Sequence, residues 1–237
     1  MITTNNTATN IFPNLLAAIK AERQKQTATF TSELNELQSV SDILNVWNYR
    51  EMLPAGKKSY KWESVEQLKK YLIDRKAKTD AKYISEQEKH LCEVSAAPAE
   101  IKDITITVEW KNNKTWGANP NATAEVRTTT PDTSGTSYNS YNSGSIGGCG
   151  YDKNSTAVAR ALNQSPALLR ALYAIRENDL NKKLHDILGY GSGYFILPRF
   201  EGGVGVSCYP AIFEKIGMQW QHVSGGKMFD VYKVARH

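Results

Sequence analysis

The stretch Ile104-Thr-Ile-Thr-Val-Glu-Trp110 marks a change in the pattern of apolar residues along this chain. Apolar residues occupy every second position, which places them on one face of an extended strand and the polar residues on the other. Ala122–Thr130 follows as a second strand, and residues 111–120 connect the two. The sequence therefore predicts an antiparallel pair of strands with one face buried.

The residues before this stretch follow a helical pattern. A helix is expected from Pro13, because a proline in the first turn lacks an N–H that would have no partner there. A further helix is expected from Ser39 or Ser41 to Pro54-Ala-Gly56. Ser64-Val-Glu-Gln67 is a capping box, in which the last side chain can reach back to the cap. It predicts a long, partly exposed helix behind it.

Ser95-Ala-Ala-Pro98 separates the helical pattern from the strands and is the expected domain boundary. Residues 1–95 are expected to be a helical region with a long basic helix, and residues 96–237 an α+β domain. A second hairpin is predicted around Gly225-Gly-Lys227, close to the C-terminus. The expected fold class is α+β: a helical N-terminal region, then an antiparallel sheet of two hairpins with helices packed on one face.

Between the two hairpins the sequence predicts a loop and three helices. Thr128–Ser145 is rich in Ser, Thr, Asn and Gly, which is typical of a long loop. The first helix is expected to be capped by Ser155 or Thr156, and the second begins with Ser165-Pro166. The third is expected at about Cys208–Ile216 and ends at the glycine that follows.

The most distinctive stretch is Gly144-Ser-Ile-Gly-Gly-Cys-Gly-Tyr-Asp-Lys-Asn-Ser-Thr156, a glycine-rich loop that leads into a helix. Such a loop presents free N–H groups and can hold an anion. It is not a Walker A motif, because Asn154 follows the lysine where Ser or Thr is required. The interpretation we prefer is that the glycines permit tight turns and close helix packing. The candidate ligand- or anion-binding residues, which include those of a second glycine-rich segment, are Gly147, Gly148, Gly150, Tyr151, Asp152, Lys153, Ser155, Gly202, Gly203 and Gly205.

Cys149 is the candidate catalytic nucleophile, because a helix N-terminus and a nearby lysine lower the pKa of a thiol. No local signature places His185 or His222 as its base, so a cysteine packed in a tight turn is the preferred interpretation. The three cysteines are an odd number at wide spacing, which is not a disulfide framework. No CxxC pair or HExxH motif occurs, and we expect neither a metal nor a cofactor.

Charge and aromatic residues suggest a partner only weakly. The formal net charge is +5, which is too small to require nucleic acid. The long helix after residue 64 is the most basic element, but acidic residues interleave with the basic ones, and a solvated face is the preferred interpretation. Surface aromatic residues could stack on bases. The candidate partner-binding residues are Trp116, Tyr138, Tyr141, Lys69, Lys70, Arg75 and Lys76.

The N-terminus lacks the basic and apolar regions of a signal peptide. No apolar run approaches the roughly 20 residues that cross a bilayer. We therefore expect a soluble, intracellular protein with no membrane partner.

Much of the C-terminal part resembles an uncharacterised family of proteins carried by bacteriophages and integrated mobile elements of gut bacteria. The resemblance rests on Glu109-Trp-Lys111, Thr115-Trp-Gly-Ala-Asn-Pro120, Gly148-Cys-Gly-Tyr-Asp-Lys153, Ser155-Thr-Ala-Val-Ala159 and Gly202-Gly-Val-Gly205. It implies a phage or mobile-element setting, but no activity and no catalytic residue.

In that setting the expected function is a non-enzymatic accessory protein that binds a host or phage macromolecule, either protein or nucleic acid. Inhibition of a bacterial defence system, such as a CRISPR nuclease, is one form that this function could take. The alternative is a small nucleotide- or anion-binding enzyme that uses the glycine-rich loops and Cys149.

Overall fold

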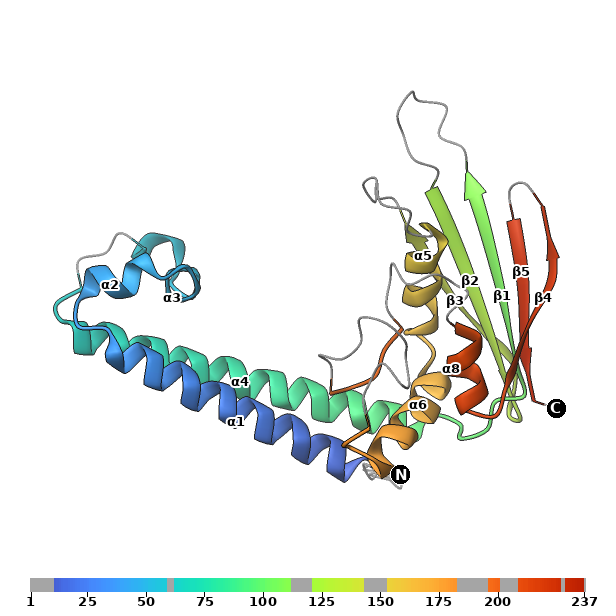
Figure 1. Cartoon of the computed structure of the whole chain (residues 1–237), viewed down its shortest axis with the longest axis horizontal. Coiled ribbons are helices and arrows are strands. Elements are labelled where there is room, and N and C mark those ends of the chain that lie inside the picture. Colours follow the sequence, from blue (N-terminus) through green and yellow to red (C-terminus); the bar gives the residue numbers. More distant parts are fainter. Residues whose placement is uncertain are drawn as a thin grey trace, which may run out of the picture. The chain divides into compact units, whose positions relative to one another are not determined.

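The computed structural model describes residues 11–58, 62–111, 121–142, 153–182, 196–200, 209–226 and 229–236. No helix within these ranges is both long and apolar enough to cross a membrane. In chain order the described elements are α1 (Pro13–Glu36), α2 (Val40–Asn45), α3 (Trp47–Glu51), the 3-10 turn η1 (Ala55–Lys57), α4 (Val65–Ala96), β1 (Asp103–Lys111), β2 (Asn121–Thr130), β3 (Thr133–Asn142), α5 (Lys153–Leu162), α6 (Pro166–Asn178), α8 (Tyr209–Lys215), β4 (Gln219–Gly225) and β5 (Phe229–Ala235) (Figure 1).

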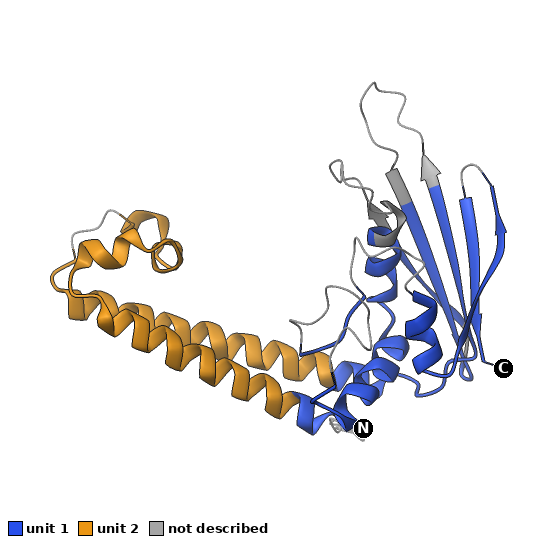
Figure 2. Ribbon diagram, viewed as in Figure 1, with its two compact units in different colours: residues 1–15, 92–237 blue, residues 16–91 orange. Residues whose placement is uncertain are grey.

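The chain forms two compact units (Figure 2). The helical unit comprises residues 16–91, and the sheet unit comprises residues 1–15 together with residues 92–237. The division falls inside α1 and inside α4, so each of these two helices contributes residues to both units.

An apolar cluster holds the short helices α2 and α3 onto α1 and α4 within the helical unit. The Tyr49 ring meets the Phe30 ring edge-on, with centroids 5.1 Å apart. Ser39 caps α2, because its side chain accepts a hydrogen bond from the backbone N–H of Asp42. The buried members of the cluster are Leu34, Ile43, Tyr49, Leu53, Leu68 and Leu72.

The capping box at the start of α4 is confirmed with a small difference. The Ser64 hydroxyl accepts from the Gln67 N–H at 3.1 Å, as the motif predicts. The Gln67 side chain reaches one residue further back than expected, and its oxygen accepts from the Glu63 N–H at 3.2 Å. Both bonds provide partners for backbone N–H groups at the helix start.

Five antiparallel strands form one sheet in the order β3-β2-β1-β5-β4. Its centre is β1, in which Ile104, Ile106 and Val108 are buried on one face, as their spacing predicts. Helices α5 and α8 pack against the strands, and Figure 1 shows the described helices of this unit on one side of the sheet. The predicted α+β class, with a helical N-terminal region and an antiparallel sheet covered by helices, is confirmed.

The predicted long loop over Thr128–Ser145 is wrong, because β3 occupies most of it. β2 continues to Thr130, which pairs with Thr133 across the two residues Pro131 and Asp132. Proline and aspartate both favour a tight turn, and that signal was overlooked in a polar segment. β3 lies at an edge of the sheet, where a strand does not need apolar residues on both faces.

The predicted start of the first helix after this region is also wrong. α5 begins at Lys153, so Ser155 and Thr156 lie inside the helix and do not cap it. The two later predictions are confirmed. The Ser165 side chain caps α6 by accepting from Leu168 N–H. Gly217 follows α8 with a φ of +73°, a conformation that favours glycine.

Residues near the N-terminus belong to the core of the sheet unit. Phe12 is 1% exposed, and its ring meets the Tyr173 ring of α6 edge-on, with centroids 5.8 Å apart. The Glu177 carboxylate accepts hydrogen bonds from the N–H groups of Asn14 at 2.8 Å and Leu15 at 2.9 Å. A side chain of α6 therefore caps the first turn of α1.

Candidate functional site

Most residues of the glycine-rich candidate site lie outside the described ranges: Gly147, Gly148, Cys149, Gly150, Tyr151, Asp152, Gly202, Gly203 and Gly205. The aromatic candidate Trp116 also lies outside them. Lys153 and Ser155 belong to the first turn of α5, and Tyr141 belongs to β3. The proposed roles of these residues in anion binding or nucleophilic chemistry stay predictions.

Of the four basic candidates on α4, two make contacts within the helical unit and two are exposed. Lys69 donates to the backbone oxygen of Asn35 at 3.1 Å, and Lys76 forms an ion pair with Asp80 within the same helix. Lys70 and Arg75 are exposed. Half of the basic candidates therefore make contacts inside the helical unit.

Asp80 is the centre of a buried polar cluster between α1 and α4. Only 7% of the residue is exposed, and its carboxylate accepts hydrogen bonds from Lys76 and from the Thr27 hydroxyl. Arg23 lies 3.7 Å from the same carboxylate, and its guanidinium also stacks on the Tyr83 ring at 3.7 Å. A buried carboxylate is tolerated only with such partners, so the cluster fixes which turns of the two helices face each other.

The charge state of Asp80 follows from these contacts. Burial opposes its ionisation, but the hydrogen bonds from Lys76 and Thr27, with the charges of Lys76 and Arg23, outweigh burial and hold the pKa of the carboxyl below its ordinary value. Asp80 therefore remains ionised at neutral pH.

The lowered pKa of Asp80 predicts a loss of stability in acid. The ionised group stabilises the folded state above its unfolded pKa of about 3.9, and this contribution is lost as the pH falls through the lower folded pKa. Urea denaturation at neutral pH and near about pH 3 should show this loss in the native chain and a smaller one in Asp80→Asn. An equal loss in both would show that other carboxyl groups account for the acid sensitivity.

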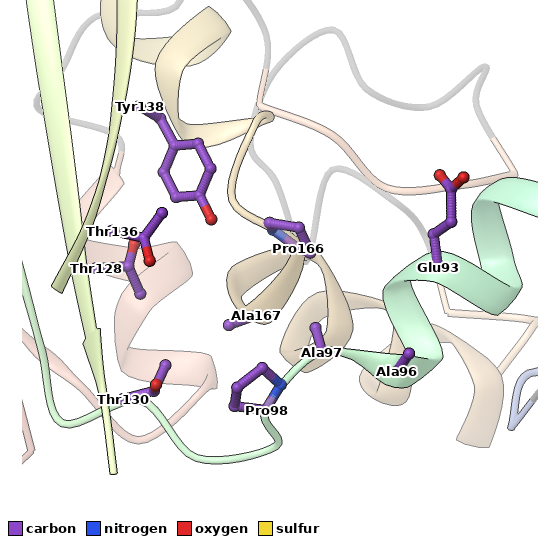
Figure 3. A pocket seen from close by; sticks show the side chains of 10 residues that line it. All are labelled: Glu93, Ala96, Ala97, Pro98, Thr128, Thr130, Thr136, Tyr138, Pro166 and Ala167. Carbon is purple, nitrogen blue, oxygen red and sulfur yellow. The ribbon is translucent and has the colours of Figure 1, made fainter. Parts of the chain in front are cut away.

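A pocket of about 260 Å³ lies in the sheet unit, where β2 and β3 meet the end of α4 and the start of α6 (Figure 3). We call it the threonine pocket. Strand residues supply a wall of hydroxyl groups, and the ends of the two helices supply an apolar wall. Its lining residues are Glu93, Ala96, Ala97, Pro98, Thr128, Thr130, Thr136, Tyr138, Pro166 and Ala167.

The hydroxyl wall is held in place by contacts with α6. Thr128 is 2% exposed, and its Oγ1 lies 3.2 Å from the Oγ of Ser165, the residue that caps α6. The half-buried Tyr138 directs its hydroxyl into the pocket (Figure 3). Burial raises the pKa of Tyr138, so the phenol is neutral at physiological pH and can donate as well as accept a hydrogen bond.

A third feature is the exposure of Trp47 on the short helix α3. The residue is 69% exposed, more than the other large exposed apolar residues of the described chain, Ile11, Val223 and Phe229. Tyr49, two positions later, is buried in the apolar cluster of the helical unit. The helix is therefore anchored on one side while it presents Trp47 on the other.

Sequence reasoning identified Tyr138 but missed the threonines and Trp47. Threonines of β2 alternate with residues of the opposite face, and this period-two pattern could have placed Thr128 and Thr130 on the buried side. The approach of α6 to these strands is a tertiary contact without a local sequence signal. The exposure of Trp47 follows from the break between α2 and α3 at Val46.

Within the described ranges, no group of three or more His, Cys, Asp or Glu residues could hold a metal ion. His222, the imidazole considered as a base for Cys149, lies 3.1 Å from the Asp230 carboxylate on β5. No protein-family model, curated protein or solved structure matches this chain.

Proposed function

We propose that this protein is a non-enzymatic accessory protein of a bacteriophage or mobile element and that its helical unit binds a protein partner through Trp47. The observation that carries the proposal is the 69% exposure of this tryptophan on an anchored helix. Tryptophan is enriched among the residues that dominate binding energy in protein interfaces.

The anchoring of α3 supports a role in binding because it reduces the entropy lost on association. Tyr49 of α3 and Leu53, which follows the helix, are buried in the same apolar cluster as the fully buried Ile43 of α2. A side chain carried on a fixed backbone loses less conformational freedom on binding than one on a loose loop. Leu44 and Val46, which precede Trp47 in the chain, are partly buried and pack against the same cluster.

The charge distribution favours protein over nucleic acid as the partner. α4, the most basic element, carries seven Lys and Arg and six Asp and Glu. Binding to a phosphate backbone gains its affinity from several uncompensated cations. Lys69 and Lys76 already contact groups of the helical unit, and Lys82 lies 3.8 Å from Glu86.

The resemblance to phage and mobile-element proteins supplies the setting of the proposal. A partner in that setting is a protein of the bacterial host or of the phage itself. Inhibition of a defence nuclease, such as a CRISPR effector, is one function that such a contact could serve.

Replacement of Trp47 by alanine is expected to weaken the partner complex at least about thirtyfold, since a central aromatic anchor contributes about 2 kcal/mol or more. The full chain and Trp47→Ala serve as baits in lysates of a gut bacterium, and captured proteins are identified by mass spectrometry. The protein lost with Trp47→Ala is then purified and its Kd is measured for each bait.

Phe229→Ala is the matched control, because Phe229 is also an exposed aromatic residue, at 43%, but belongs to the sheet unit. It should leave the Kd unchanged. Retention of the partner by Trp47→Ala would overturn the role of this residue. Salt-sensitive binding of duplex or single-stranded DNA in fluorescence anisotropy, unaffected by Trp47→Ala, would favour nucleic acid instead.

A further inference from the structure

We infer that the threonine pocket is a binding site for a small, neutral, hydroxyl-rich ligand of about the size of a single sugar or cyclitol ring. The site lies in the sheet unit and does not depend on the proposed role of Trp47. The volume of the pocket, the chemistry of its two walls and the charges around it support this ligand.

The volume of the pocket matches a ligand of one ring. About 260 Å³ corresponds to roughly eight or nine water molecules at about 30 Å³ each. Pockets for drug-sized ligands occupy about 300–1,000 Å³, so this pocket lies just below that range. A six-membered ring with its substituents fits such a space.

The hydroxyl wall sets the type of hydrogen bond. Thr128, Thr130 and Thr136 from two adjacent strands and the neutral phenol of Tyr138 line one side. A hydroxyl group both donates and accepts, so this wall matches a ligand whose own groups do the same. Sugars and cyclitols carry such groups around their rings.

The opposite wall suits the C–H face of the same ring. Pro98 and Pro166 contribute two apolar rings, and three alanines line the space between the helix ends (Figure 3). Pro98 is held near the pocket because Arg170 of α6 donates a hydrogen bond to the backbone oxygen of the preceding Ala97. A ring with hydroxyls at its edge and carbons on its face can contact both walls at once.

The charges around the pocket argue against an anion. Among the described lining residues none carries a positive charge, and the only ionisable acid is Glu93, whose carboxylate points away from the other lining side chains (Figure 3). A phosphate or carboxylate would lose its hydration without a cation to replace it. A neutral polyol has a smaller desolvation cost.

Titration of the full chain, labelled with ¹³C at its threonine methyl groups, tests the inference. The probes are glucose, N-acetylglucosamine and myo-inositol, with inorganic phosphate as the charged alternative. At least one polyol is expected to shift the methyl resonances of Thr128, Thr130 and Thr136. Thr105 and Thr107 point to the opposite face of the sheet from the buried Ile104, Ile106 and Val108, so their resonances should remain unchanged.

Thr136→Val removes one hydroxyl and keeps the shape of the side chain, and it should weaken polyol binding about fivefold. Thr136 is exposed, so this substitution should leave the fold intact, and the remaining methyl resonances verify that. Thr107→Val is the matched control and should bind as the native chain does. The inference is overturned if no polyol shifts the pocket threonines, if phosphate alone does so, or if Thr136→Val binds as tightly as Thr107→Val.

Discussion

Asp80→Ala is expected to lower the free energy of unfolding of the helical unit by about 3 kcal/mol or more, because it leaves the Lys76 ammonium, on a side chain only 14% exposed, without its carboxylate. The Thr27 hydroxyl also loses an acceptor, and the Arg23 guanidinium loses the opposite charge 3.7 Å away. The measurement is hydrogen exchange of the α1 and α4 backbone amides in the full chain, which reports opening of this unit separately from the sheet unit.

Glu86→Ala is the matched control for Asp80→Ala. Glu86 is paired with Lys82 at the same spacing along α4, but both side chains are mostly exposed, at 61% and 78%. Exposed ion pairs contribute about 1 kcal/mol or less to stability, so amide hydrogen exchange should change little in Glu86→Ala. If amide hydrogen exchange were accelerated similarly in the two variants, burial of the Asp80 cluster would add nothing to the stability of the helical unit.

Phe12→Ala is expected to destabilise the sheet unit by about 3 to 5 kcal/mol, as typical for removal of a buried phenylalanine. Phe12 is 1% exposed and contacts Tyr173, so its loss leaves a cavity against α6. Exchange of the α6 amides in the full chain measures the effect. Ile11→Ala, which truncates the neighbouring residue at 44% exposure, should have a much smaller effect.

Phe12→Ala also tests the domain boundary expected at Ser95–Pro98. We predict from this boundary that residues 96–237 fold without the N-terminal helices, and this stays a prediction. Such a fragment lacks Phe12 and the two N–H groups that bind Glu177, so it should unfold at lower urea concentration than the sheet unit of the full chain. The N-terminal contacts would be dispensable if the sheet unit unfolded at the same urea concentration in the fragment and in the full chain and if Phe12→Ala did not change its stability.

The sequence predicted the elements whose signals are local. The alternation from Ile104 to Val108 gave the central strand, and the glycines at 225–226 gave the closing hairpin. Ser165-Pro166 gave the start of α6, because an N-cap followed by proline constrains the backbone over only a few residues. These signals require no knowledge of the rest of the fold.

The sequence did not predict the elements that depend on distant contacts. β3 reads as a loop because its residues are small and polar, and only pairing with β2 makes it a strand. Phe12 and Glu177 are far apart in the chain, and nothing in either segment predicts their association. Asp80 resembles any charged residue of an exposed helix until α1 is placed against it.

In the candidate site, too, residues with a local sequence signal were predicted and residues that depend on distant contacts were not. Tyr138 was selected as an aromatic residue of a loop, and the structure places it instead on a strand beside three threonines in a pocket. The threonines have no motif, because their hydroxyls meet only through the pairing of β2 with β3 and the approach of α6. The glycine-rich stretch has a strong local signature, but the glycine residue type is compatible with many backbone conformations.

The strand order of the sheet has a consequence for the order of events during synthesis. β1 pairs on one side with β2, its neighbour in the chain, and on the other with β5, so that Asp103 faces Ala235. The nascent chain can form the meander of β1, β2 and β3 early, but one edge of β1 remains unpaired until β5 has left the ribosome. That edge belongs to an apolar strand, which is the kind of surface that pairs with other chains. Translation that stops before β5 should therefore yield a species that aggregates or recruits chaperones, whereas completion of the last hairpin closes the edge.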